Sequence, residues 1–146
     1  QIHGREIVEG RFVDNNVFES LSNCKAIIFA SPTYMGGVAA QFKAFADATS
    51  EVWGKQQWSG KYSAGITSGA SLNGDQSSTL QYMALLASQH GMYWVGLESA
   101  FQNEKFDRFG CQLGVVSHSD DGSVNDIDLA TAKYLARRVA QAIKSQ

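Results

Sequence analysis

The sequence AIIFASPTYMGG (residues 26–37) begins with a run of apolar residues and ends with two glycines. A continuous apolar run without polar alternation is typical of a strand that is covered on both faces by helices. The loop Ser31–Gly37 follows directly, and behind it apolar residues recur at intervals of three and four, as in a helix packed on a sheet. These residues therefore predict one strand–loop–helix unit of a parallel sheet.

The same unit recurs further along the chain. Tyr62–Thr67 and Met92–Leu97 predict two more strands, because both are short segments rich in β-branched, aromatic or other apolar residues. Between them the spacing predicts a helix, with Asp75 as its N-cap and Gly91 as its left-handed stop. Strand, loop and helix in alternation predict an α/β domain built on a doubly wound parallel sheet.

The remaining segments are less regular. Residues 1–23 predict mostly loop, with a short helix over Val17–Leu21. The stretch 98–125 is rich in glycine, serine and aspartate, and predicts a long loop with a strand piece at 113–116. A closing helix is predicted from near Asp128, with its apolar residues on one face.

Composition bounds the class of protein. The 146 residues are 44% hydrophobic and 18% charged, so we expect a single folded domain over residues 1–146. A net charge of -2 argues against nucleic acid as a partner. No apolar run is long enough to span a bilayer, so we expect no membrane partner and a cytoplasmic location. Cys24 and Cys111 are far apart in the sequence, and we expect free thiols that are buried in the core.

The loop Ser31–Gly37 is a candidate binding segment, because ligands of parallel sheets bind outside the carboxyl ends of the strands. Pro32 fixes the exit of the chain from the strand, and the two glycines let the backbone approach a flat ligand closely. Tyr34 and Met35 can then cover a ring. From spacing alone, a simple turn into the helix with a surface aromatic is an equally good interpretation.

The loop Ser68–Gly74 follows the second strand and is rich in small and hydroxyl-bearing residues. Such a loop places several backbone N–H groups at a strand end, where they can donate to the carbonyls and ring nitrogens of a planar heterocycle. A flexible connector has the same composition, so the loop alone is a weak indication.

Other residues indicate structural roles more strongly than chemical ones. Trp53 favours core or interface packing, and His90 favours a role at a helix end. His118 is followed by serine and aspartate, but the partners of a catalytic triad meet in space rather than in sequence, and no nucleophile elbow surrounds Ser68. We predict no catalytic side chain and no metal site, as is typical of a protein that positions a cofactor carrying its own chemistry.

Several motifs occur together in a characteristic order. They are Ser31-Pro32-Thr33-Tyr34-Met35-Gly36-Gly37, Gln41-Phe42-Lys43, Trp53, Gly60-Lys61, Thr67 to Gly74, and Gln89-His90-Gly91-Met92. In this order they resemble the flavodoxin-like NAD(P)H:quinone oxidoreductases, the group described as Trp-repressor-binding-protein-like flavoproteins. The resemblance runs from about Lys25 to the C-terminus and implies a flavodoxin-like doubly wound parallel sheet flanked by helices.

The resemblance also implies a function. It implies FMN as cofactor, NAD(P)H as electron donor and a quinone or flavin as small-molecule acceptor, in an enzyme that forms a homodimer or homotetramer. The residues that it places at the flavin are Pro32, Thr33, Tyr34, Met35, Gly36, Ser68, Gly69, Ala70, Ser71, Leu72, Asn73 and Gly74. It places Trp53 and His90 on the substrate side, Trp53 from a neighbouring subunit, although Gln89 stands where the family often has a histidine.

One part of the family pattern is not found in this sequence. The family begins with a strand and a Ser/Thr-rich loop whose N–H groups hold the FMN phosphate. We therefore expect an N-terminally incomplete domain that lacks the first βα unit, exposes an edge beside 26–30 and binds FMN poorly. Two non-enzymatic alternatives are a flavodoxin-like electron carrier, which is usually more acidic, and a cofactor-free binding module.

Overall fold

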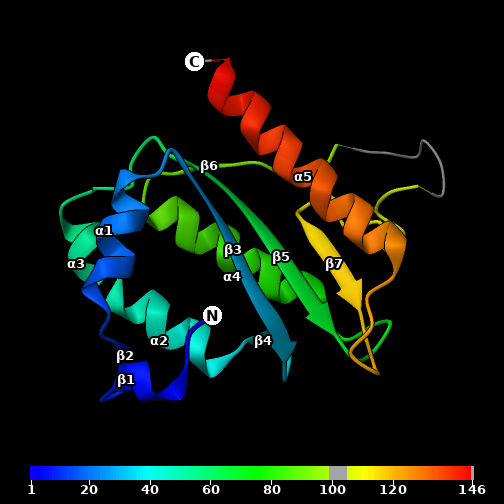
Figure 1. The fold of residues 1–146 in the computed structure, drawn as a ribbon, viewed down its shortest axis with the longest axis horizontal. Coiled ribbons are helices and arrows are strands. Elements are labelled where there is room, and N and C mark those ends of the chain that lie inside the picture. Colours follow the sequence, from blue (N-terminus) through cyan, green and yellow to red (C-terminus); the bar gives the residue numbers. More distant parts are fainter. Residues whose placement is uncertain (99–104, 146) are drawn as a thin grey trace.

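The computed structural model describes residues 1–98 and 105–145. Its central sheet has β5 (Tyr62–Gly69) in the middle, with β3 (Ala26–Tyr34) on one side and β6 (Tyr93–Trp94) and β7 (Val115–His118) on the other. β3, β6 and β7 all run parallel to β5, as Figure 1 shows for the three longer strands. The parallel sheet predicted from the apolar run at 26–30 is confirmed.

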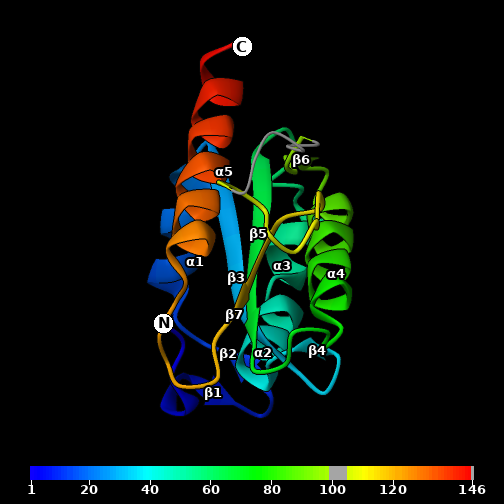
Figure 2. The same ribbon diagram turned by 90° about the vertical axis from the view of Figure 1, so that its right-hand side faces the viewer.

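Helices cover both faces of this sheet. α4 (Gln76–Gln89) lies on one face and α5 (Asp126–Lys144) on the other, which is clear when the sheet is seen edge-on (Figure 2). Phe29 belongs to the core with Leu80 and Met83, whereas Ala64 belongs to the core with Leu135 and Val139 on the α5 side. α2 (Ala40–Ala48) and the short α3 (Ser50–Gly54) complete the α4 side. In the described part of the chain, no helix is long and apolar enough to cross a bilayer.

The N-terminal region is more ordered than the sequence predicted. A 3-10 turn at Gly4–Glu6 and a hairpin of β1 (Ile7–Val8) and β2 (Arg11–Phe12) precede α1 (Asn15–Asn23). The reason is aromatic packing: the ring of Phe18 stacks on that of Phe45 with 5.7 Å between centroids, and Phe12 meets Phe45 edge-on at 6.0 Å. α1 is therefore stabilised by contacts far away in the sequence.

β3 and β5 extend beyond their predicted ends, and the two strands after α4 differ more in their bounds. β6 is only Tyr93–Trp94, because the chain beyond it leaves β5 and the N–H of Leu97 donates to the carbonyl of Gln112 at 2.7 Å. β7 begins at Val115 rather than at residue 113, and the carbonyl of Leu113 accepts a hydrogen bond from the Trp94 indole at 2.8 Å. The expectation for the cysteines was half wrong: both are free thiols, but Cys24 is exposed and Cys111 is half-buried.

One edge of β3 is open. Residues Ala26–Pro32 pair with β5 along one side, and along the other side no strand among residues 1–98 and 105–145 pairs with them. Ile28 lies on the face of β3 opposite to Phe29 and remains 40% exposed, since α5 packs mainly on β5 and β7. The edge and the neighbouring part of the sheet face therefore present apolar surface.

Candidate functional site

The two predicted loops lie side by side. β3 and β5 are neighbours, and their register pairs Ser31 with Thr67 and Pro32 with Ser68. The chain segments that follow therefore leave the same end of the sheet from strands about 4.8 Å apart. The geometric condition for a site shared by both loops is met (Figure 1).

The first loop is a tight β-hairpin rather than an irregular loop. β3 continues to Tyr34, and β4 (Gly37–Val38) folds back on it in antiparallel pairing. Met35 and Gly36 form the two-residue turn with φ of 49° and 75°, the left-handed pair that fits the twist of a hairpin. Tyr34 is 64% exposed and Met35 is fully exposed, so the hairpin carries two uncovered apolar side chains beside the second loop.

Thr33 uses its side chain inside the protein. Its hydroxyl lies 2.8 Å from the Thr67 hydroxyl and 2.8 Å from the Thr79 hydroxyl, and both partners are buried. These three residues join β3, β5 and α4 at the root of the site. The Thr33 hydroxyl therefore stabilises the base of the loop through two partners that sequence patterns did not reveal, and the expected contact of Thr33 with a flavin stays a prediction.

Three consecutive carbonyl groups of the second loop are hydrogen-bonded within the protein. The carbonyl of Gly69 accepts from the N–H of Ser119 at 3.1 Å, and that of Ala70 lies 3.2 Å from His118 Nε2. A carbonyl only accepts, so His118 carries its proton on Nε2. The carbonyl of Ser71 accepts from Gln76 Nε2 at 2.6 Å.

The N–H groups of the same loop are free. Within the described residues, the backbone N–H groups of Ala70, Ser71, Leu72 and Asn73 donate no hydrogen bond, whereas that of Gly74 donates to Gln76 Oε1 at 2.9 Å. Unpaired backbone donors at a strand end can bind the acceptor edge of a ligand. The loop therefore offers a run of free donors at residues 70–73, while the carbonyls of Gly69, Ala70 and Ser71 are already hydrogen-bonded within the protein.

Gln76 is a residue that the sequence analysis missed. Asp75 was expected as the N-cap of α4, but it lies in the left-handed region with φ of 59° and makes no capping hydrogen bond with its side chain. Gln76 is only 5% exposed and holds the loop from within. A glutamine next to a glycine-rich loop carries no pattern that would have indicated this.

An ion pair supports the loop from the α5 side. The Asp128 carboxylate, which is 3% exposed, accepts two hydrogen bonds from Arg108, at 2.7 and 2.8 Å, and the carboxylate raises the pKa of Arg108. The same carboxylate accepts from the N–H of His118 at 3.3 Å. His118 is therefore held by Asp128 on one side and holds Ala70 on the other, which is a structural role rather than that of a triad histidine.

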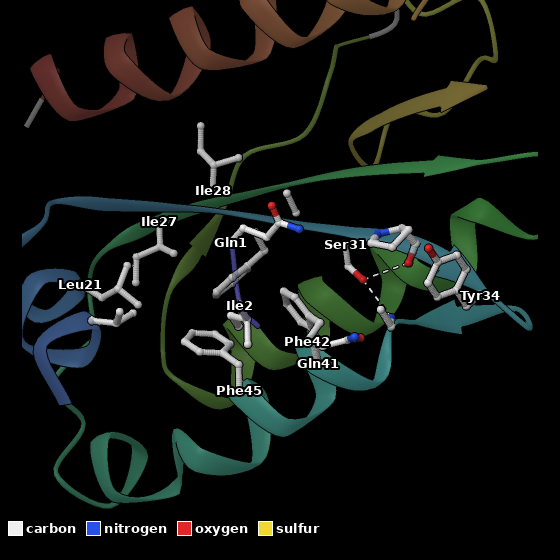
Figure 3. A pocket seen from close by; sticks show the side chains of 15 residues that line it. Gln1, Ile2, Leu21, Ile27, Ile28, Ser31, Tyr34, Gln41, Phe42 and Phe45 are labelled. Atoms are coloured by element: carbon white, nitrogen blue, oxygen red, sulfur yellow. Dashed lines mark hydrogen bonds between the residues drawn. The ribbon is translucent and has the colours of Figure 1, made fainter. Parts of the chain in front are cut away.

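Open space lies on both sides of the carboxyl end of β3. A cavity of about 400 Å³ is lined by Ser31, Pro32 and Ser68, and the buried hydroxyl of Ser117 in its wall has no partner among the described residues. A second cavity, of about 500 Å³, runs along β3 and reaches Tyr34 (Figure 3). Open space therefore reaches the start of both loops, at Ser31, Pro32 and Ser68, and extends to Tyr34 in the first loop.

The two residues predicted on the substrate side, Trp53 and His90, lie away from the two loops. His90 follows the last residue of α4, about 20 Å along the helix axis from its start at the second loop. It is 1% exposed, with its ring 4.6 Å from that of Trp58, so it packs in the core of this chain, and its contact with substrate stays a prediction. Trp53 in α3 is 47% exposed, and its role at a neighbouring subunit stays a prediction.

Comparison with known proteins decides the family. Residues 14–105 match the family described as NADPH-dependent FMN reductase. The chain belongs to this family. This confirms the flavodoxin-like flavoprotein relationship inferred from the loop motifs, and the family description agrees with the expected class of NAD(P)H-dependent oxidoreductase.

Individual relatives agree with this assignment. The flavodoxin FldP of Pseudomonas aeruginosa is 41% identical, over 85% of this chain and 73% of the relative. An NAD(P)H dehydrogenase (quinone) of Archaeoglobus fulgidus is 37% identical over 84% of this chain, which spans only 61% of that relative. A crystal structure of a flavodoxin, WrbA-like protein from Agrobacterium tumefaciens matches with a TM-score of 0.72 and 37% identity, covering 97% of this chain and 80% of the other. The flavodoxin-like α/β fold is thereby confirmed.

Proposed function

We propose that this chain supplies the flavin-ring site of an FMN-dependent NAD(P)H oxidoreductase that reduces a quinone or a second flavin. The observation that carries the proposal is the second loop, in which the carbonyls of residues 69–71 are hydrogen-bonded within the protein while the N–H groups of residues 70–73 are free. FMN, when bound, supplies the chemistry of accepting a hydride from NAD(P)H and passing the electrons to the acceptor.

The described residues fit an isoalloxazine ring. One edge of that ring carries carbonyl and nitrogen acceptors, which match the free donors of Ala70–Asn73. The hairpin supplies apolar cover from Tyr34 and Met35, and Gly36 permits close approach of the backbone. Side chains of this chain would orient and cover the ring; none of them is needed as an acid or base.

The acceptor and the assembly are part of the same proposal. A planar quinone would stack on the face of the ring that the hairpin leaves open, and its reaction would depend on stacking geometry. The exposed Trp53 supports a homodimer or homotetramer, in which an aromatic of the partner subunit closes the site. The cytoplasmic location stays a prediction, which fractionation of the producing cell would test.

The experiment is a flavin titration followed by a turnover assay. Lumiflavin, which lacks the phosphate, reports on ring recognition alone, and FMN reports in addition on any phosphate contact. Tyr34→Ala should weaken lumiflavin binding about two- to twelvefold, from the loss of an aromatic contact of about 0.5–1.5 kcal/mol. Leu85→Ala, a change at an exposed apolar residue of α4, is the control and should bind as the unaltered chain does.

Two results would decide against the proposal. Unaltered protein that binds neither flavin would favour the cofactor-free binding module. Protein that binds FMN but does not oxidise NADH or NADPH in the presence of a quinone would favour the electron carrier, for which the name of the Pseudomonas flavodoxin is the supporting observation.

A further inference from the structure

Gln76 is an unusual residue to find buried. It opens α4 directly after the second loop and is only 5% exposed. Glutamine is mostly exposed in folded proteins, and burial of its amide is tolerable only if both halves find partners. Here both halves do, and both partners are backbone groups of the loop.

The loop is wrapped around this amide. Nε2 donates to the carbonyl of Ser71 at 2.6 Å, and Oε1 accepts from the N–H of Gly74 at 2.9 Å. Gly69 packs directly against the amide, since a Cβ at that position would lie 2.8 Å from Nε2. One side chain therefore fixes the entrance, the middle and the exit of the loop.

The opposite side of the loop is held by β7. Ser119 donates its N–H to the carbonyl of Gly69, and His118 Nε2 donates to the carbonyl of Ala70. Gln76 takes the third consecutive carbonyl, that of Ser71. If this third contact were lost, the Ser71 carbonyl could turn toward the ligand and repel its acceptor atoms.

We propose that Gln76 is a positioning residue for the flavin ring: by binding the Ser71 carbonyl and the Gly74 N–H, it keeps that carbonyl turned away from the ligand and leaves the neighbouring N–H groups free to donate to it. This inference rests on the proposed function. It differs from a purely structural role because it concerns the polarity of the loop surface and not only its stability.

The decisive variant is Gln76→Glu, which keeps size and shape. One carboxylate oxygen can still accept from Gly74, but the other faces the Ser71 carbonyl and repels it. A protonated carboxyl would donate to that carbonyl and restore the contact, and burial shifts the protonation of such a group toward higher pH. Gln81→Glu, at an exposed position of the same helix, is the matched control.

Lumiflavin affinity is measured by fluorescence for both variants and the unaltered chain, between about pH 7.5 and about pH 5. We expect Gln76→Glu to bind about tenfold more weakly at the upper end and to recover as the pH falls. Gln81→Glu and the unaltered chain should show no such recovery. His118 faces the loop in all three proteins, and its Nε2 remains a donor when the ring is protonated.

The outcomes separate the two proposals. Failure of the unaltered chain to bind lumiflavin would overturn the proposed function, and this inference with it. If the unaltered chain binds and Gln76→Glu binds equally well at every pH, only the positioning role is overturned. Gln76→Leu provides a second check, since it cannot recover at any pH; recovery by this variant would also overturn the role, and circular dichroism would verify that each variant is folded.

Discussion

His90 Nε2 lies 2.8 Å from the hydroxyl of Thr49, and both side chains are buried. The Thr49 hydroxyl donates its own proton to the carbonyl of Ala46 at 2.7 Å, so His90 must be the donor in the shared bond. Its Nδ1 then carries a lone pair that has no partner among the described residues. Burial lowers the pKa of His90, since an imidazolium would place a second N–H where the structure offers no acceptor.

This arrangement predicts acid sensitivity. The folded protein disfavours the charged imidazole ring. Above about pH 6.5, the pKa of a histidine in the unfolded chain, His90 is neutral in both states and costs no stability. Between that value and the lower pKa of His90 in the folded protein, the unfolded chain is protonated at His90 while the folded protein is not. As the pH falls through this range, the free energy of unfolding should drop by at most about 1.4 kcal/mol per pH unit. Urea unfolding of the unaltered chain and of His90→Gln, between about pH 7.5 and about pH 5, should give a smaller slope for the variant; equal slopes would contradict the prediction.

The three-threonine cluster predicts a loss of stability on removing one hydroxyl. Thr79→Val keeps the shape but leaves Thr33 with one partner instead of two. We expect the free energy of unfolding to fall by about 1–2 kcal/mol, as for other buried hydrogen bonds. Ser78→Ala, at an exposed position of the same helix, should change it by less than about 0.5 kcal/mol. Equal effects of the two substitutions would argue against the cluster.

The pair of Arg108 and Asp128 predicts a contrast between ion pairs. Asp128→Asn removes a buried carboxylate that also receives the N–H of His118, and should destabilise the protein by about 2 kcal/mol, between the values for exposed and buried pairs. Asp47→Asn breaks the exposed pair with Lys43 and should cost less than about 0.5 kcal/mol. Thermal or urea unfolding of both variants measures the two losses of stability. An equal or larger loss for Asp47→Asn would contradict the structural role of the Asp128 carboxylate.

Substitution by alanine should affect stability very differently at two glycines. A Cβ at Gly114 would lie 2.5 Å from the backbone carbonyl of Gly65, which cannot move without disturbing β5, so Gly114→Ala should cost about 2 kcal/mol or more. Gly37 has open space around its Cβ position and no left-handed φ, so Gly37→Ala should be nearly neutral. Unfolding midpoints of the two variants measure the difference; a tolerated alanine at 114 would mean that the two backbones lie further apart.

The sheet could be predicted from sequence because its evidence is local. The run Ala26–Ala30 is apolar at every position, and the spacing of helix residues behind it repeats within a few turns. The two loops could be nominated for the same reason, because their place follows from strand order and parallel direction. The N-terminal helix was underestimated, since Phe18 is stabilised by Phe45, a contact between distant parts of the chain.

The side-chain hydrogen bonds inside the site could not be predicted. Gln76 turns back into the loop that precedes it, and Thr79 meets Thr33 from a different element, so both depend on tertiary packing. The packing of His90 could not be predicted for a related reason: a position after a helix does not determine which way the ring points, and here the ring packs on that of Trp58. Polar residues with buried partners leave no periodic pattern in the sequence.

The open side of β3 has a consequence for handling the protein. Between Lys25 and Tyr34 the only charged side chain is Lys25, so this strand has almost none of the gatekeeping charge that discourages edge-to-edge association. Extended apolar segments, above all those of partly unfolded copies, would add to it by main-chain hydrogen bonding. Light scattering should therefore rise with protein concentration under mildly denaturing conditions, and Ile28→Lys, which places a charge on the exposed face of the strand, should suppress it.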